Sequence, residues 1–118
     1  MKHMIITGNV GGDLELFNDK NGNQFATFRV AVRAGKDKTG KDKTEWVYVN
    51  CYGAEIDFAK KYIRKGDKVL VRGEPSVQLH YAVTGKTFAN QRMSAEHIEL
   101  LATKPDDFSK ITDEYDYE

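Results

Sequence analysis

The chain has 118 residues, of which 40% are hydrophobic and 31% charged, and its formal net charge at pH 7 is zero. This length accommodates one domain with a modest core, and no apolar run approaches the roughly 18 residues that a membrane span requires. Gly8 interrupts the N-terminal apolar stretch before a secretory core of about 7–15 residues can form, so no export signal is visible and the cytoplasm is the expected compartment.

The zero net charge conceals an uneven distribution. Residues 104–118 contain two lysines and six acidic residues, a net charge of −4, whereas residues 1–103 contain 16 basic and 12 acidic residues, a net charge of +4. Hydrophobic periodicity also stops at Pro105. We therefore predict a mildly basic folded domain over residues 1–103 and an acidic, flexible tail over residues 104–118.

The expected elements are short apolar segments separated by turn residues, which is the pattern of β-strands. Strands are predicted at residues 4–10, 25–33, 44–53, 68–72 and 92–101, with a further, longer segment at 76–83 and a short one at 14–17. The sequence N-D-K-N-G-N at 18–23 contains a hairpin-type Asn-Gly turn, and T-G-K at 84–86 is another predicted turn. The charged loop at 36–43 joins two strands in a long hairpin.

One helix is predicted, at residues 54–65, because Ile56, Ala59 and Ile63 recur on one helical face. Acidic residues begin this segment and basic residues end it, as the helix dipole favours. Gly66 is expected to end the helix in a left-handed conformation. Five strands with one helix between the third and the fourth are typical of the OB-fold, a small Greek-key barrel, so the predicted fold class is all-β, of OB type.

The sequence T-E-W-V-Y-V-N-C-Y-G at 44–53 carries the strongest functional signal. Its two-residue period places Trp46, Tyr48 and Tyr52 on one face of the strand. The other face consists of small apolar residues: Val47, Val49 and Cys51. Small apolar side chains suit a core, where Cys51 acts as a small hydrophobe, so the aromatic side chains are expected to point outward.

Five segments resemble the bacterial and phage single-stranded DNA-binding (SSB) proteins. They are I-I-T-G-N-V-G-G-D, N-G-N-Q-F-A-T-F-R-V-A-V, T-E-W-V-Y-V-N-C-Y-G, F-A-K-K-Y-I-R-K-G-D-K-V-L-V-R-G and A-E-H-I-E-L-L, at residues 5–13, 21–32, 44–53, 58–73 and 95–101. Each is weak alone, but their collinear order is specific. The resemblance implies an OB-fold homotetramer that binds single-stranded DNA without sequence preference and protects it during replication, recombination and repair.

The resemblance also implies which aromatic residues stack on bases. Trp46 and Tyr52 match two stacking positions of the family, and a third falls on His80 or Tyr81. Gly35 takes the place of a further family tryptophan, which implies fewer stacking platforms. The outward pattern adds Tyr48 and Phe88 as stacking candidates, with a subunit contact as the alternative for both.

Basic side chains would supply the contacts to phosphates. The candidates lie on the outward face of the second predicted strand, along the hairpin loop and in the second half of the barrel: Arg29, Arg33, Lys36, Lys38, Lys41, Lys43, Arg72 and Lys86. For the loop lysines the alternative is a solvated hairpin end that contacts nothing.

The tail departs from the family pattern. Many bacterial members end in Asp-Ile-Pro-Phe or a similar sequence that docks partner enzymes, whereas this chain ends in D-E-Y-D-Y-E. The residues available to bind replication or recombination proteins are Asp113, Glu114, Tyr115, Asp116, Tyr117 and Glu118. The missing Pro-Phe favours a phage or mobile-element member.

Catalysis is not expected. His3, His80 and His97 are scattered, the single cysteine excludes a Cys pair, and no phosphate-binding glycine loop occurs. We therefore predict no enzyme activity, no metal site and no cofactor. The alternative function is that of a primosome-type OB-fold module, which uses its aromatic face for protein partners and binds single strands weakly.

Overall fold

The computed structural model describes residues 2–81 and 87–103, with the backbone alone described at 78–81 and 87–90. Within these residues the elements are β1 (Met4–Val10), β2 (Glu15–Asn18), β3 (Gln24–Lys36), β4 (Asp42–Cys51), α1 (Ala54–Tyr62), β5 (Lys68–Tyr81) and β6 (Thr87–Ala102). The predicted turn at 84–86, with Lys86, and the predicted tail lie outside the described residues.

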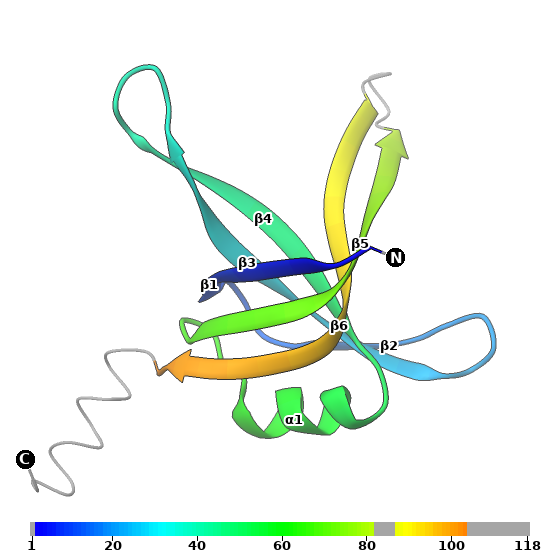
Figure 1. Cartoon of the computed structure of the whole chain (residues 1–118). Coiled ribbons are helices and arrows are strands. Elements are labelled where there is room, and N and C mark those ends of the chain that lie inside the picture. Colours follow the sequence, from blue (N-terminus) through cyan, green and yellow to red (C-terminus); the bar gives the residue numbers. More distant parts are fainter. Residues whose placement is uncertain (1, 82–86, 104–118) are drawn as a thin grey trace, which may run out of the picture.

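The strands form a closed barrel (Figure 1). Their order is β1-β5-β6-β4-β3-β2, and β1 also pairs with β3 through Asn9 and Val10, which closes the sheet on itself. β4 and β6 run parallel, while the other pairs are antiparallel. Gly8 permits the close approach of β1 and β3, because a Cβ there would collide with the carbonyl oxygen of Ala31.

This topology confirms the predicted all-β fold of OB type. The short segment predicted at 14–17 is the strand β2, which pairs with β3 across the turn at 19–23 as a hairpin. The structure joins the segments predicted at 68–72 and 76–83 into the single strand β5. A register shift between Arg72 and Gly73 lets this strand bend without ending.

The core is built from the inward side chains of the long strands, including Val47, Val49 and Cys51 as predicted. Phe28 and Met93 are its largest fully buried side chains. Burial, with a smaller contribution from the nearby carboxylate of Glu55, raises the pKa of Cys51 to about 12. The thiol is therefore protonated at neutral pH and packs as a small apolar group.

α1 lies across one end of the barrel and buries Ile56 and Ala59 (Figure 1). The predicted helix end was wrong: α1 stops at Tyr62, and Ile63 is buried with an extended backbone (φ −94°, ψ 125°). Gly66 is left-handed (φ 93°), but in the turn before β5, where its N–H donates to the Val10 carbonyl at 2.8 Å. No helix among the described residues is long and apolar enough to cross a membrane.

Candidate nucleic-acid interface

The outward side of β3 and β4 carries the aromatic residues that the sequence singles out. Trp46 and Tyr52 are 42% and 43% exposed, and Tyr48 is half-buried. Arg29 of β3 lies opposite Tyr48, and Ala31 lies opposite Trp46. Opposite residues of an antiparallel pair share one side of the sheet, so aromatic and basic side chains occur together here. We call this outward side, with Arg29, Trp46, Tyr48 and Tyr52, the aromatic face.

The ring of Trp46 is held against the start of the β1–β2 connection. The guanidinium carbon of Arg29 lies 4.6 Å from the centroid of the indole ring. The Nη2 group of Arg29 donates to the carbonyl oxygen of Gly11 at 3.2 Å. A Cβ at Gly11 would collide with the indole ring, so the absence of a side chain there makes room for Trp46. These contacts orient the ring before any ligand binds.

Tyr48 is covered by an arginine from a distant strand. β6 runs parallel to β4 and places Arg92 beside Tyr48, with the guanidinium carbon 5.1 Å from the ring centroid. The Nη1 group of Arg92 also donates to Oδ1 of Asn50 at 3.3 Å, and the same oxygen accepts from Oγ1 of Thr27 at 2.9 Å. Arg92 is not among the site residues predicted from the sequence.

Tyr52 belongs to a stack of three rings, of which the other two, Phe25 and Phe17, are not among the residues predicted from the sequence. Its ring lies 5.4 Å from that of Phe25 with an interplanar angle of 26°, and Phe25 lies 5.6 Å from Phe17 at 27°. Phe17 is opposite Phe25 in the β2–β3 hairpin, and 44% of its surface is exposed. Phe25 lies four residues before Arg29 on the same strand, so both point outward. This two-residue alternation could have identified Phe25 from the sequence.

An open groove with a volume of about 620 Å³ lies among these residues, although Trp46 and Tyr52 do not line it. Its walls come from β2, β3, β4 and β6 and include Phe17, Phe25 and Tyr48. Arg29 and Arg92 add positive charge, while Asp13 and Glu15 add carboxylates. A groove that combines rings, arginines and uncharged polar groups can receive an unpaired base and the backbone that carries it.

The predicted phosphate contacts fall into separate regions. Arg33 is exposed opposite Thr44, on the aromatic face. Arg72 lies opposite Ile5 of β1 and His97 of β6, and does not line the groove. Exposed lysines follow the β3–β4 hairpin, which extends away from the barrel (Figure 1): Lys36, Lys38, Lys41 and Lys43.

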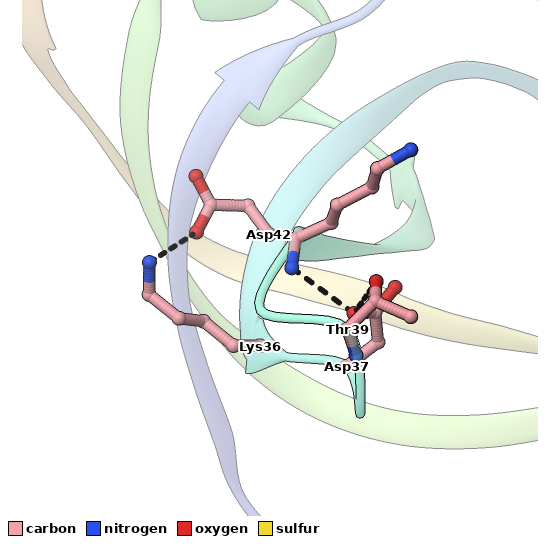
Figure 2. A network of polar contacts seen from close by, with 5 residues as sticks. Lys36, Asp37, Thr39 and Asp42 are labelled. Carbon is pink, nitrogen blue, oxygen red and sulfur yellow. Dashed lines mark hydrogen bonds and ion pairs between the residues drawn. The ribbon is translucent and has the colours of Figure 1, made fainter.

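The tip of this hairpin is organised by its own polar groups (Figure 2). One carboxylate oxygen of Asp37 accepts from Oγ1 of Thr39 at 2.6 Å, from the N–H of Thr39 at 2.8 Å and from the N–H of Lys41 at 3.0 Å. These hydrogen bonds, that of the Thr39 side chain first, lower the pKa of Asp37 below its ordinary 3.8. Nζ of Lys36 lies 3.8 Å from Oδ1 of Asp42.

The remaining stacking candidates lie at the far end of the β5–β6 pair. By backbone register His80 pairs with Phe88, and Tyr81 pairs with Thr87. The side chains of these residues lie outside the described part of the chain, so their predicted roles stay predictions.

The chain folds as a closed OB barrel, and its outer face carries a groove lined by rings and arginines. These two features place it among the OB-fold proteins that present a sheet surface to an extended ligand. Within that class, the chain belongs to the single-strand binding protein family, whose model matches residues 1–101. It is 30% identical over 105 residues to the single-stranded DNA-binding protein of Helicobacter hepaticus, covering 86% of this chain and 62% of that protein.

The homologous protein of Wolinella succinogenes, named in the same way, is 28% identical over 104 residues, which cover 86% of this chain and 64% of the relative. The chain thus spans less than two thirds of the length of either of these relatives.

Two solved structures show the same fold. The small single-stranded DNA-binding protein from Streptomyces coelicolor superposes with a TM-score of 0.69 at 24% identity, covering 84% of this chain and 93% of its own. The Plasmodium falciparum SSB in complex with ssDNA gives a TM-score of 0.63 at 24% identity, covering 88% of this chain and 96% of its own. At these identities the likeness establishes the OB-fold.

Proposed function

We propose that this chain binds single-stranded DNA with little sequence preference, and that it coats and protects such strands during replication, recombination and repair. The observation that carries this proposal is the aromatic face: the solvent-accessible ring of Trp46 lies under Arg29, the exposed ring of Tyr52 stacks on Phe25, and Arg29 and Phe25 line a groove that crosses four strands. Membership of the single-strand binding protein family and the names of the curated relatives support it.

Stacking on the rings supplies the sequence-tolerant part of the affinity. A base stacked on an aromatic side chain contributes roughly 1–3 kcal/mol, whichever base it is, because every base has a π-face. Trp46 and Tyr48 are already oriented by Arg29 and Arg92, so little side-chain freedom remains to be lost on binding. A planar guanidinium also stacks on bases, which extends the platform beyond the rings themselves.

Phosphate contacts supply the salt-dependent part. Arg29 and Arg33 on the aromatic face and the lysines of the β3–β4 hairpin are the proposed contacts, and Arg72 and Lys86 are proposed as further ones from the other half of the barrel. His80, Tyr81 and Phe88 are proposed to continue the stacking surface along β5 and β6.

A homotetramer in the cytoplasm, formed by folded domains over residues 1–103, would wrap the strand, and the acidic residues 104–118 would recruit replication or recombination proteins. We propose a binding protein without catalytic activity.

The experiment that tests the central proposal is a titration of intrinsic fluorescence with oligo(dT), with duplex DNA as the control and two salt concentrations. Trp46 is the only tryptophan, so its signal reports directly on the aromatic face. Quenching by the single strand alone, weaker at high salt, is the expected result. No quenching and no binding by anisotropy would overturn the proposal in favour of a protein-interaction module.

A further inference from the structure

A row of polar side chains crosses the floor of the groove beside the stacked rings. Glu15 of β2 lies opposite Thr27 of β3, Thr27 lies opposite Asn50 of β4, and Arg92 of β6 is hydrogen-bonded to Asn50. All four residues line the groove. They form a continuous polar strip across four strands, which stacking alone does not require.

The hydrogen bonds within this strip determine which groups remain free. Oδ1 of Asn50 accepts from both Thr27 and Arg92. Since a guanidinium can only donate, the amide atom that faces Arg92 is the oxygen, and the amide nitrogen of Asn50 faces away from it. That nitrogen has no hydrogen-bond acceptor among the described residues. Asn50 and Arg92 therefore present donors to the groove.

The opposite end of the strip presents an acceptor. Glu15 is exposed and carries no ion pair within the described residues. The rings of Phe25 and Tyr52 lie two residues along the strands from Thr27 and Asn50, on the same side of the sheet and about 7 Å away along the strand. A base stacked on these rings has its polar edge beside the strip.

We propose that this strip selects cytosine at one position of the bound strand, a preference that rests on the proposed binding of single-stranded DNA. Cytosine offers two adjacent acceptors, O2 and N3, to the donors of Asn50 and Arg92, and its exocyclic amine can donate to Glu15. Uracil and thymine place an N–H between two acceptors and lack the amine. Guanine has adjacent acceptors at O6 and N7 but no amine beside them, and adenine has only one acceptor, N1 or N7, on either side of its amine.

The test compares oligo(dC) with oligo(dU) of equal length at neutral pH, because these bases differ only at N3 and at the 4-substituent. The variant Asn50→Asp keeps the oxygen that accepts from Thr27 and Arg92 but replaces the free amide donor with a carboxylate oxygen. We expect the ratio of the dissociation constants, dU over dC, to fall by about 5-fold or more in this variant. The ratio cancels the general effect of the added charge.

Gln24→Glu is the matched control, because it adds the same charge on β3 at an exposed residue outside the groove. It should weaken both oligomers alike and leave the ratio unchanged. Arg92→Lys provides a second test, since it keeps the charge but removes the fork of donors, and it should lower the same ratio.

An unchanged ratio in both Asn50→Asp and Arg92→Lys would overturn the cytosine preference while leaving the proposed function intact. If the wild-type protein bound neither oligomer, nor oligo(dT), the proposed function would fail and the preference with it. Circular dichroism of each variant establishes that the ratio is measured on folded protein.

Discussion

The aromatic face and the β3–β4 hairpin tip share the strands β3 and β4 but differ in how their side chains are held. In and beside the groove, Arg29 covers Trp46, Arg92 covers Tyr48, and the ring of Phe25 lies between two others. At the tip, the turn is closed by Asp37 and Thr39, and the lysine side chains extend into solvent.

This difference separates two kinds of binding energy. Rings that are already oriented lose little freedom when a base stacks on them, so the groove should contribute short-range affinity that salt affects weakly. Exposed lysines act through long-range attraction, which salt screens within about 10 Å at 0.1 M. The following predictions test this division of roles, from the largest expected effect to the smallest.

Trp46→Ala should weaken binding of oligo(dT) by roughly 1–3 kcal/mol, because it removes one stacking platform. Fluorescence anisotropy of a labelled oligomer measures the loss, since the variant has no tryptophan. Tyr62→Ala is the matched control: Tyr62 is 45% exposed but lies on α1, away from the groove. Equal losses in the two variants would show that the aromatic face has no special role.

Phe25→Leu should weaken binding by about 1 kcal/mol, because leucine retains apolar volume but interrupts the stack between Phe17 and Tyr52. The same anisotropy titration measures the change. Phe58→Leu, which disrupts the ring pair of Phe58 and Tyr62 on α1, should leave affinity unchanged. Full affinity in Phe25→Leu would mean that the ring of Phe25 contributes nothing to stacking.

Lys38→Gln should leave the affinity for oligo(dT) nearly unchanged at high salt. It should reduce the steepness of the plot of the logarithm of the association constant against the logarithm of the salt concentration by about 0.7, the contribution of one phosphate contact on a single strand. Titrations at four salt concentrations give the slope. Lys60→Gln removes an equal charge from the last turn of α1 and serves as the control. Identical slopes for Lys38→Gln and the wild type would favour a solvated hairpin end.

Acidification should loosen the hairpin tip with little effect on the groove. The lowered pKa of Asp37 means that its hydrogen bonds contribute fully above the ordinary value of 3.8 and are lost as the pH falls through the lowered pKa. The amide resonances of Thr39 and Lys41 should therefore shift in one step below pH 3.8. Asp37→Asn should abolish that step, and a midpoint above 3.8 would contradict the prediction.

Much of the fold followed from local patterns. Alternation in residues 44–53 predicted which side of β4 is buried, and turn residues predicted both hairpins that the described residues contain. The end of α1 did not follow, because a buried isoleucine at position 63 suits either a helix or an extended segment. There the choice depends on the turn that Asp67 organises by accepting from the N–H of Arg64 at 2.8 Å.

By itself the sequence determined the fold class and the exposed rings of Trp46 and Tyr52, since both depend on a two-residue period that neighbouring residues reveal. Only the tertiary structure decided the composition of the groove. Phe17 reaches Phe25 through hairpin register, and Arg92 reaches Tyr48 and Asn50 through the parallel pairing of β4 with β6. Such contacts join residues far apart in the chain, and local periodicity carries no information about which strands become neighbours.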